Sequence, residues 1–219
     1  MSSINPYFTF NYSQPEEYRF SHDSVFLARQ VFELMTPEEI QNIKGLDLCS
    51  GCGIIGLDFI FHCQKEWGKT PRSFDFLEVQ DVYRSHFVEN VTRLGQVASS
   101  LQFVNQNYTA LQNSENAGKY DLILCNPPYF FADKGTLSPS EFKNRCRFFI
   151  DSGFAELLLG ISASLAENGK AYLLLRDLSE HGWHSLEEAK SILKGTLHIE
   201  LLGDIRGTHF VCLSSAKKF

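Results

Sequence analysis

Residues 45–56 read Gly-Leu-Asp-Leu-Cys-Ser-Gly-Cys-Gly-Ile-Ile-Gly, and this stretch decides the fold class. Its first five residues are mostly apolar and predict a short buried strand. The spacing Gly51-x-Gly53-x-x-Gly56 follows at once, and an apolar run over about 55–63 predicts a helix. A strand, a glycine turn and a helix in this order are typical of α/β proteins whose backbone N–H groups meet a ligand at the helix N-terminus.

Strands and helices alternate along the rest of the chain. The expected strands after the first are 73–78, 101–105, 120–125, 171–175, 197–202 and 209–214. The expected helices are 24–35, one starting at 37, 55–63, 82–94, 152–167 and one starting at 185. This alternation predicts an α/β fold with a Rossmann-like, doubly wound, seven-stranded sheet that is mostly parallel. The last two strands are joined by the turn-like 203–207, so we expect an antiparallel last strand.

Composition sets the limits on organisation and partners. With 219 residues, 43% hydrophobic and 21% charged, the chain suits one globular domain at 43–219, preceded by an N-terminal helical extension at 1–42. A net charge of −6 argues against sequence-blind nucleic-acid binding but leaves room for a local basic patch. No apolar run approaches the roughly 20 residues that span a bilayer, and the first residues lack the regions of a signal peptide. We therefore expect a cytoplasmic protein, and we favour a monomer.

The cysteines and histidines do not predict a metal site. Cys49 and Cys52 fit the C-x-x-C template of a redox or zinc site, but no second pair has zinc spacing. The histidines show no ligand spacing either. We expect reduced thiols and no metal.

Asn126-Pro127-Pro128-Tyr129 follows the apolar strand at 120–125. Proline fixes its own φ and lacks an N–H, so the strand stops and the motif forms a stiff turn at the carboxyl end of the strand. Ligands bind at this edge of an open α/β sheet. The amide oxygen of Asn126 and the carbonyl of Pro127 can accept hydrogen bonds from an amine, and the ring of Tyr129 can stack on a planar group. These residues are the predicted catalytic set.

Two motifs together resemble those of a known enzyme family. Leu-Asp-Leu-Cys-Ser-Gly-Cys-Gly at 46–53 resembles the first motif of class I S-adenosylmethionine-dependent methyltransferases. Asn-Pro-Pro-Tyr at 126–129 resembles the fourth motif of their amino-methylating branch. The resemblance implies S-adenosyl-L-methionine as cofactor and S-adenosyl-L-homocysteine as product. It implies these cofactor-binding residues: Asp47, Ser50, Gly51, Gly53, Glu78, Asn107 and Asn126.

The resemblance also assigns roles to these residues. The glycine loop passes the methionyl and ribose portions with Asp47 beneath it, and we expect any side chain at Gly53 to occupy the path of the ligand. Glu78 stands at about the 20-residue spacing of an acidic partner for ribose hydroxyls, which taken alone also fits a dinucleotide oxidoreductase. Asn107 stands where the family commonly has Asp and is expected to bond the adenine amine, because its amide carries both a donor and an acceptor.

Flanking segments narrow the resemblance. Gln-Pro-x-x-Tyr-Arg-Phe-Ser-His-Asp-Ser-Val-Phe-Leu-Ala at 14–28 resembles the N-terminal segment of bacterial tRNA adenine-N6 methyltransferases, which modify the adenine beside the anticodon of a valine tRNA. The similarity runs from about residue 8 to the last strand. In such enzymes this segment packs over the cofactor, so the resemblance places Asp23 and Ser24 at its methionyl end. Their alternative role is helix capping.

A basic segment at 133–147 also resembles this family. We expect it to be a long loop that orders when RNA binds, and the alternative is a solvated surface loop. Its predicted RNA-phosphate contacts are Lys134, Lys143, Arg145 and Arg147. Residues 61–72 look longer than a minimal connection and are either an RNA-facing insertion or a surface extension.

The function predicted from this resemblance is methyl transfer from S-adenosylmethionine to N6 of an adenine in tRNA. Glutamine-N5 methylation of a protein such as a release factor uses the same turn, but enzymes of that kind usually carry a helical N-terminal domain, and few residues precede Gly45. Guanine-N2 methylation of rRNA and, less favoured, adenine methylation of DNA are the other enzymatic alternatives. A non-catalytic S-adenosylmethionine-binding scaffold would keep the glycine loop without needing Asn126 and Tyr129. The turn alone does not separate adenine from glutamine.

Overall fold

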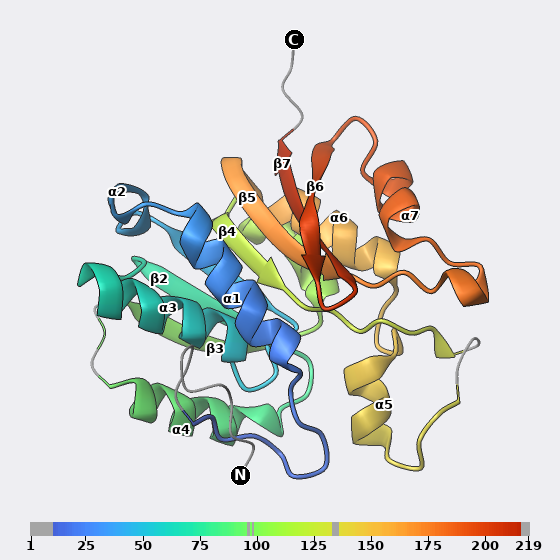
Figure 1. The fold of residues 1–219 in the computed structure, drawn as a ribbon, viewed down its shortest axis with the longest axis horizontal. Helices are drawn as coiled ribbons and strands as arrows, with labels where there is room; N and C mark the ends of the chain where they lie inside the picture. The colour runs from blue at the N-terminus through green and yellow to red at the C-terminus, as the bar shows by residue number, and fades with distance from the viewer. Residues whose placement is uncertain (1–10, 96, 98, 133–135, 216–219) are drawn as a thin grey trace.

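A single seven-stranded sheet runs through the protein in a computed structural model that describes residues 11–95, 97, 99–132 and 136–215 (Figure 1). The strands lie in the order β3-β2-β1-β4-β5-β7-β6. Their bounds are β1 Lys44–Leu48, β2 Ser73–Glu78, β3 Ser100–Asn105, β4 Tyr120–Cys125, β5 Leu165–Leu175, β6 Leu197–Ile205 and β7 Thr208–Ser215. The first five strands pair in parallel, and β7 is antiparallel to both β5 and β6. The predicted fold class is confirmed.

Helices cover both faces of the sheet. The α-helices are α1 His22–Leu34, α2 Pro37–Ile40, α3 Ile54–Trp67, α4 Tyr83–Leu94, α5 Glu141–Arg147, α6 Phe154–Ser164 and α7 Ser185–Ile192. Three short 3₁₀ helices are η1 Tyr108–Gln112, η2 Ser114–Asn116 and η4 Ser179–His181. Among the described helices, none has both the length and the apolar character needed to cross a membrane.

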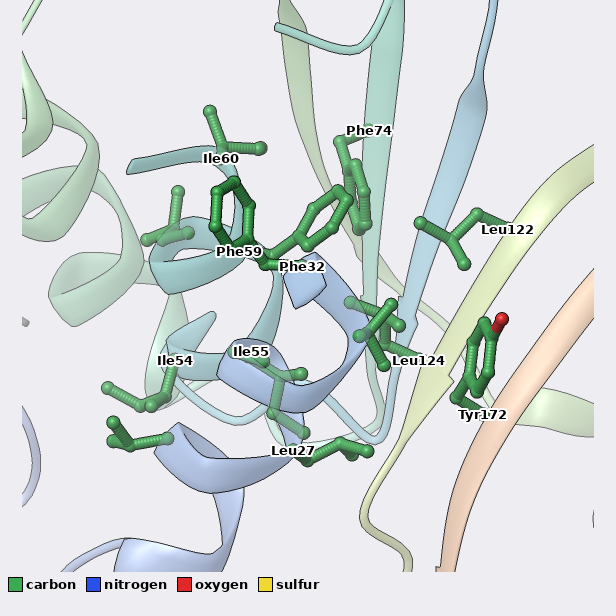
Figure 2. Close-up of a cluster of buried hydrophobic side chains, with 14 of the residues drawn as sticks. Leu27, Phe32, Ile54, Ile55, Phe59, Ile60, Phe74, Leu122, Leu124 and Tyr172 are labelled. Carbon is green, nitrogen blue, oxygen red and sulfur yellow. The ribbon is translucent and has the colours of Figure 1, made fainter. Parts of the chain in front are cut away.

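One hydrophobic core lies on each face of the sheet. Neighbouring residues of β4 serve both cores, because successive side chains of a strand point to opposite faces: Leu124 belongs to one cluster and Ile123 to the other. Figure 2 shows part of the first cluster, which contains Leu27 and Phe32 of α1 together with Ile55 and Phe59 of α3. The second cluster joins the sheet to α6, α7 and η1. Burying each large apolar side chain contributes about 1.5–3 kcal/mol.

The last glycine of the 51–56 motif allows α3 to pack closely on β2. A Cβ atom at Gly56 would lie 2.6 Å from the ring of Phe76 and 3.0 Å from the ring of Phe74. A larger residue would therefore push the helix away from the strand. The motif spacing thus serves helix packing as well as the loop.

The N-terminal segment shares its core with the sheet. Tyr12 and Ile40 are buried in the same cluster as α1 and α3. The hydroxyl of Tyr12 donates a 2.7 Å hydrogen bond to Asp58 of α3, and Asn90 of α4 donates to the carbonyl groups of Ser13 (2.9 Å) and Cys52 (3.1 Å). Residues 11–13 are thereby tied to the glycine loop through α4.

Three local predictions are corrected. The helix expected to end at 63 continues to Trp67, whose ring stacks on Phe32 at 4.4 Å, so residues 61–67 form the last part of α3. The helix expected to run to 167 stops at Ser164, and β5 begins at once at Leu165, because that residue pairs with Tyr120. The turn expected over 203–207 is shorter than predicted, because β6 continues to residue 205.

The basic segment contains an unexpected helix. Residues 141–147 form α5, and the hydroxyl of Ser140 accepts a hydrogen bond from the N–H of Lys143 at its start. The side-chain amide of Asn144 is buried and bonds both the N–H (2.7 Å) and the carbonyl (2.7 Å) of Ser138. The expectation that the whole segment is a loop is therefore wrong for this part.

Candidate functional site

A cavity of about 380 Å³ lies at the carboxyl ends of β1, β2, β4 and β5. The strand order reverses between β1 and β4, and a crevice at such a point is where doubly wound sheets bind ligands. The volume is within the range of small-molecule sites. Its walls come from segments that are far apart in sequence. They are the N-terminal segment (Gln14, Tyr18, Phe20, Ser21, Asp23, Ser24), the glycine loop (Cys49–Cys52) with Ile54 and Ile55, the ends of β2 and β3 (Leu77–Gln80, Gln106–Tyr108) with Tyr83, the turn at 126–130, residues 145–152, and Arg176.

The glycine loop is held against the end of β2 by a buried carboxylate. Glu78 Oε2 accepts a hydrogen bond from the N–H of Gly51 at 2.9 Å, and Oε1 accepts one from the N–H of Gln80 at 2.9 Å. Burial raises the pKa of Glu78, and these two backbone donors oppose that shift. Each carboxylate oxygen has two lone pairs, so Glu78 can still accept from a ligand in the cavity.

An unpartnered hydroxyl lies beside this carboxylate. Ser50 lines the cavity, its N–H donates to the carbonyl of Leu77 at 3.1 Å, and its buried Oγ has no hydrogen-bond partner among the described residues. Buried polar atoms are nearly always satisfied in folded proteins, so a ligand or water is the expected partner. The loop therefore fits a ligand that carries hydroxyl or charged polar groups.

Two of the predicted cofactor residues do not line the cavity. Asp47 is fully buried beneath the loop, where its Oδ2 accepts from the N–H of Gly56 at 2.8 Å and burial raises its pKa. Gly53 has φ +85° at the start of α3, and a Cβ there would meet the side chains of Phe87 at 2.9 Å and Leu57 at 3.1 Å. A side chain at Gly53 would thus strike the core and not the path of a ligand, which corrects our expectation. Asp47 and Gly53 therefore support the glycine loop from its buried side.

Asn107 lines the cavity and is held at the start of η1. Its Oδ1 accepts from the N–H of Thr109 (2.9 Å), and its Nδ2 donates to the carbonyl of Asp151 (3.2 Å). The hydroxyl of Ser152 lies within hydrogen-bond distance of both Oδ1 of Asn107 (2.9 Å) and the carbonyl of Asp151 (2.6 Å), and its one hydrogen can serve only one of them. The predicted bond from Asn107 to an adenine amine stays a prediction.

Asn126 is oriented by a serine from the N-terminal segment. Its Nδ2 donates to Oγ of Ser24 at 3.0 Å. Its Oδ1 faces Tyr129, whose hydroxyl donates to it. Ser24 and its neighbour Asp23 are buried in the first turn of α1, and Asp23 lies 3.5 Å from Arg206 of the β6–β7 turn. The bond from Asn126 to Ser24 joins residues 102 positions apart.

The turn after β4 is braced by the end of α5. The N–H groups of Tyr129 and Phe130 both donate to the carbonyl of Arg147, at 3.1 and 3.0 Å, and the N–H of Phe149 donates back to Phe130 at 2.8 Å. Burial raises the pKa of the Tyr129 hydroxyl, so it stays a neutral donor at physiological pH. Pro127 is buried within the turn.

Arg176 was missed from the sequence. It follows β5 directly, lines the cavity, and places its guanidinium carbon 5.9 Å from the centroid of the Tyr129 ring. A single arginine after an apolar strand carries no motif, so only the sheet order brings it to this edge.

The three predicted RNA contacts that the structure describes have different environments. The guanidinium of Arg145 is held by both carboxylate oxygens of Asp151, at 2.8 and 3.0 Å. Arg147 is exposed, lines the cavity, and lies over the rings of Phe130 and Phe148 at 5.3 and 5.7 Å. Lys143 is in α5 and does not line the cavity, and Lys134 falls outside the described residues.

The thiols near the loop are reduced. All six cysteines are free, with Cys52 buried and Cys49 half-buried. Within the described ranges, no group of three or more His, Cys, Asp or Glu side chains could hold a metal ion.

Comparison with known proteins gives a consistent set of relatives. No family model matches the chain. The chain is 31% identical over 134 residues to a Bacteroides fragilis protein named tRNA1(Val) (adenine(37)-N6)-methyltransferase, which covers 61% of this chain and 52% of that protein. It is 27% identical over 174 residues to a protein of the same name from a Shewanella species, covering 78% and 69%. The chain spans about half the length of the Bacteroides fragilis relatives that it matches. The resemblance stated from the motifs is confirmed.

A solved structure with the same fold binds the expected cofactor. The 16S rRNA N2 G1207 methyltransferase from T. thermophilus, in complex with AdoMet and guanosine, matches with a TM-score of 0.63 at 13% identity. The match covers 92% of this chain and 45% of that chain. At this identity the likeness shows the fold alone, and that fold is Rossmann-like.

Proposed function

We propose that this protein transfers a methyl group from S-adenosyl-L-methionine to N6 of an adenine in tRNA. One observation carries the proposal: the amide of Asn126 is fixed by Ser24 with its oxygen beside the Tyr129 ring, in the same cavity as Glu78 and the glycine loop. An acceptor for an amine, a stacking surface and a polar cofactor cradle thus share one space. The names of the curated relatives support adenine N6 as the acceptor.

The chain holds residues that fit this cofactor. Glu78 would accept the ribose hydroxyls, and Gly51 and the unpartnered hydroxyl of Ser50 would lie along the ligand. Asp23 lines the cavity beside Ser24 and would face the methionyl ammonium. When bound, S-adenosyl-L-methionine supplies an electrophilic methyl group on a sulfonium, and S-adenosyl-L-homocysteine is the product. Residues 14–24 would cover the site.

Asn126 and Tyr129 prepare the amine for reaction. The lone pair of an exocyclic amine is delocalised into its ring, so the nitrogen is a weak nucleophile. Hydrogen bonds from the NH₂ group to Oδ1 of Asn126 and to the carbonyl of Pro127 favour a pyramidal nitrogen and stabilise the positive charge that develops there. Stacking on Tyr129 contributes about 1–3 kcal/mol and aligns the base. The surplus proton leaves to water after transfer.

In the structure, the hydroxyl of Tyr129 occupies the acceptor that the amine needs. The incoming NH₂ group replaces this hydroxyl, and the ring turns to stack on the base. The hydrogen bond from the Tyr129 hydroxyl to the Asn126 amide oxygen is exchanged for one from the substrate NH₂ group. Because the hydroxyl holds this place beforehand, water does not have to be removed from it when the substrate binds. Tyr129 thus has two positions in the proposed cycle.

The remaining features of the proposal follow from the substrate. Arg147 would contact RNA phosphates, and the site needs neither a metal nor a membrane. A tRNA substrate puts the protein in the cytoplasm. We favour a monomer, because the described cavity is assembled from one chain.

Methyl transfer from labelled cofactor tests the proposal. Purified protein is expected to label tRNA transcripts and to yield N6-methyladenosine on nucleoside digestion. Asn126→Ala is expected to abolish turnover and keep cofactor binding, measured by calorimetry. Labelling of a release factor with none of total tRNA would replace the proposal with glutamine-N5 methylation, and labelled N2-methylguanosine in rRNA would replace it with guanine methylation.

A further inference from the structure

Two arginines reach the rim of the cavity from different elements. Arg147 ends α5, and Arg176 follows β5. Both are exposed and both line the cavity. Arg147 lies over the ring of Phe130 and Arg176 lies over the ring of Tyr129, at 5.3 and 5.9 Å from the ring centroids. The two cations therefore border two successive residues of the turn that is proposed to receive the base.

Neither cation is neutralised by the protein. Among the described residues, no carboxylate lies within ion-pair distance of Arg147 or Arg176. The arginines that do have such a partner are Arg29, Arg84, Arg93, Arg145 and Arg206. The nearest acid in sequence to Arg176 is Asp177, and its Oδ1 accepts instead from the N–H (2.8 Å) and the hydroxyl (2.9 Å) of Ser185.

The place of these two arginines, and not the lack of an ion pair, sets them apart. Arg19 and Arg72 are also exposed and have no carboxylate partner among the described residues, but neither lines the cavity. The guanidinium groups of Arg147 and Arg176 each lie over an aromatic ring at the opening of the cavity and have no carboxylate partner in the described part of the chain. Their N–H groups are therefore available to bind an anion of the substrate. Guanidinium groups bind phosphate with two parallel hydrogen bonds.

We propose that Arg147 and Arg176 form a phosphate-binding pair that holds the sugar–phosphate backbone on the two sides of the nucleotide placed in the Asn126–Tyr129 site. The pair rests on the proposed function and deepens it. A base stacked on Tyr129 leaves its two flanking phosphates at the rim, where the cations lie. A glutamine side chain of a protein substrate brings no phosphate there, so the pair selects a polynucleotide as the acceptor.

The test uses the full chain with Arg147→Ala, Arg176→Ala and the double variant. Arg72→Ala is the matched control, since Arg72 is exposed and does not line the cavity. Each cavity variant is expected to raise the KM for tRNA transcripts about 10-fold and to lower the slope of log KM against log salt by about 1, while kcat at saturating tRNA is kept. Arg176→Lys is expected to restore the salt slope because it restores the charge.

A binding measurement separates this pair from the rest of the site. Labelled anticodon stem-loop RNA is titrated into Asn126→Ala protein with and without Arg176→Ala, and fluorescence anisotropy gives the Kd. A higher Kd for the protein that also carries Arg176→Ala supports the phosphate-binding pair. If the wild type methylates tRNA and the cavity variants match Arg72→Ala in KM and salt slope, the pair is wrong and the proposed function stands. If the wild type does not methylate tRNA, the proposed function falls and the pair falls with it.

Discussion

Removing the hydroxyl of Ser24 should disable the amide of Asn126 without touching the substrate directly. Ser24 is 6% exposed and accepts the only hydrogen bond that Nδ2 of Asn126 donates to the described protein. In Ser24→Ala, the amide of Asn126 loses the hydrogen bond that holds it in its present orientation. A rotated amide presents NH₂ to the substrate amine, and two donors facing each other cannot bond.

The expected loss follows from one hydrogen bond in a partly exposed place. A neutral hydrogen bond contributes about 1 kcal/mol net, and a buried donor left without a partner costs about 1–3 kcal/mol. Asn126 faces the cavity, so water reaches it and the low end of this range applies. About 1–1.4 kcal/mol corresponds to a 5- to 10-fold fall in kcat. Ser24 also lines the cavity among residues 14–24, which are proposed to cover the cofactor, so the KM for the cofactor is measured alongside kcat.

Steady-state methyl transfer to tRNA measures kcat for Ser24→Ala against Ser21→Ala. Ser21 is the matched control, because it also lines the cavity, is exposed and makes no side-chain cap bond at the start of α1. Thermal unfolding of both variants separates a local effect from a folding defect. A Ser24→Ala enzyme with the kcat of the wild type would refute the positioning role, as would an equal fall in Ser21→Ala.

Three further outcomes are expected. Tyr129→Phe should keep turnover because it retains the ring, whereas Tyr129→Ala should lose about 1–3 kcal/mol of base stacking, seen as a 5- to 150-fold fall in kcat/KM. Gly56→Ala should lower the free energy of unfolding by about 1–3 kcal/mol in urea melts, since the new methyl group would lie 2.6 Å from Phe76; an unchanged urea midpoint would contradict this. Burial raises the pKa of Asp47, so the folded state holds that proton more tightly than the unfolded state. The protonated Asp47 carboxyl stabilises the fold below about pH 4, and this contribution is lost as the pH rises through the raised pKa. The difference in the free energy of unfolding between Asp47→Asn and the wild type should therefore increase over this pH range. A difference that does not change with pH would contradict the expected raised pKa of Asp47.

The sheet was predictable from the sequence because its strands are short and apolar, and because glycine or proline residues mark where key strands end. The glycine turn after β1 and the two prolines after β4 mark where these strands end, and the cavity lies at these same ends. The glycine at position 95 likewise closes α4. The ends of these strands and helices depend on residues that are close in sequence, so they can be predicted from the sequence alone.

Two of the errors involve partners that are distant in sequence. Trp67 extends α3 because it stacks on Phe32, and Leu165 starts β5 because it pairs with Tyr120. No periodicity or motif near these residues reports such contacts. The same reason hid Arg176 and the link between Ser24 and Asn126, because both depend on which strand ends become neighbours.

The bond between the Tyr129 hydroxyl and the Asn126 amide oxygen has a consequence for the resting protein. A methyl donor held in the cavity with no substrate present is exposed to hydrolysis. An open amide oxygen would fix a water molecule beside the donor, with a lone pair turned toward the methyl group. The phenol takes one of the two acceptor positions of that oxygen. On the proposed function, a water molecule beside the donor would have to share the amide oxygen with this phenol, so the residue proposed to receive the base also limits water at the methyl group while no base is bound.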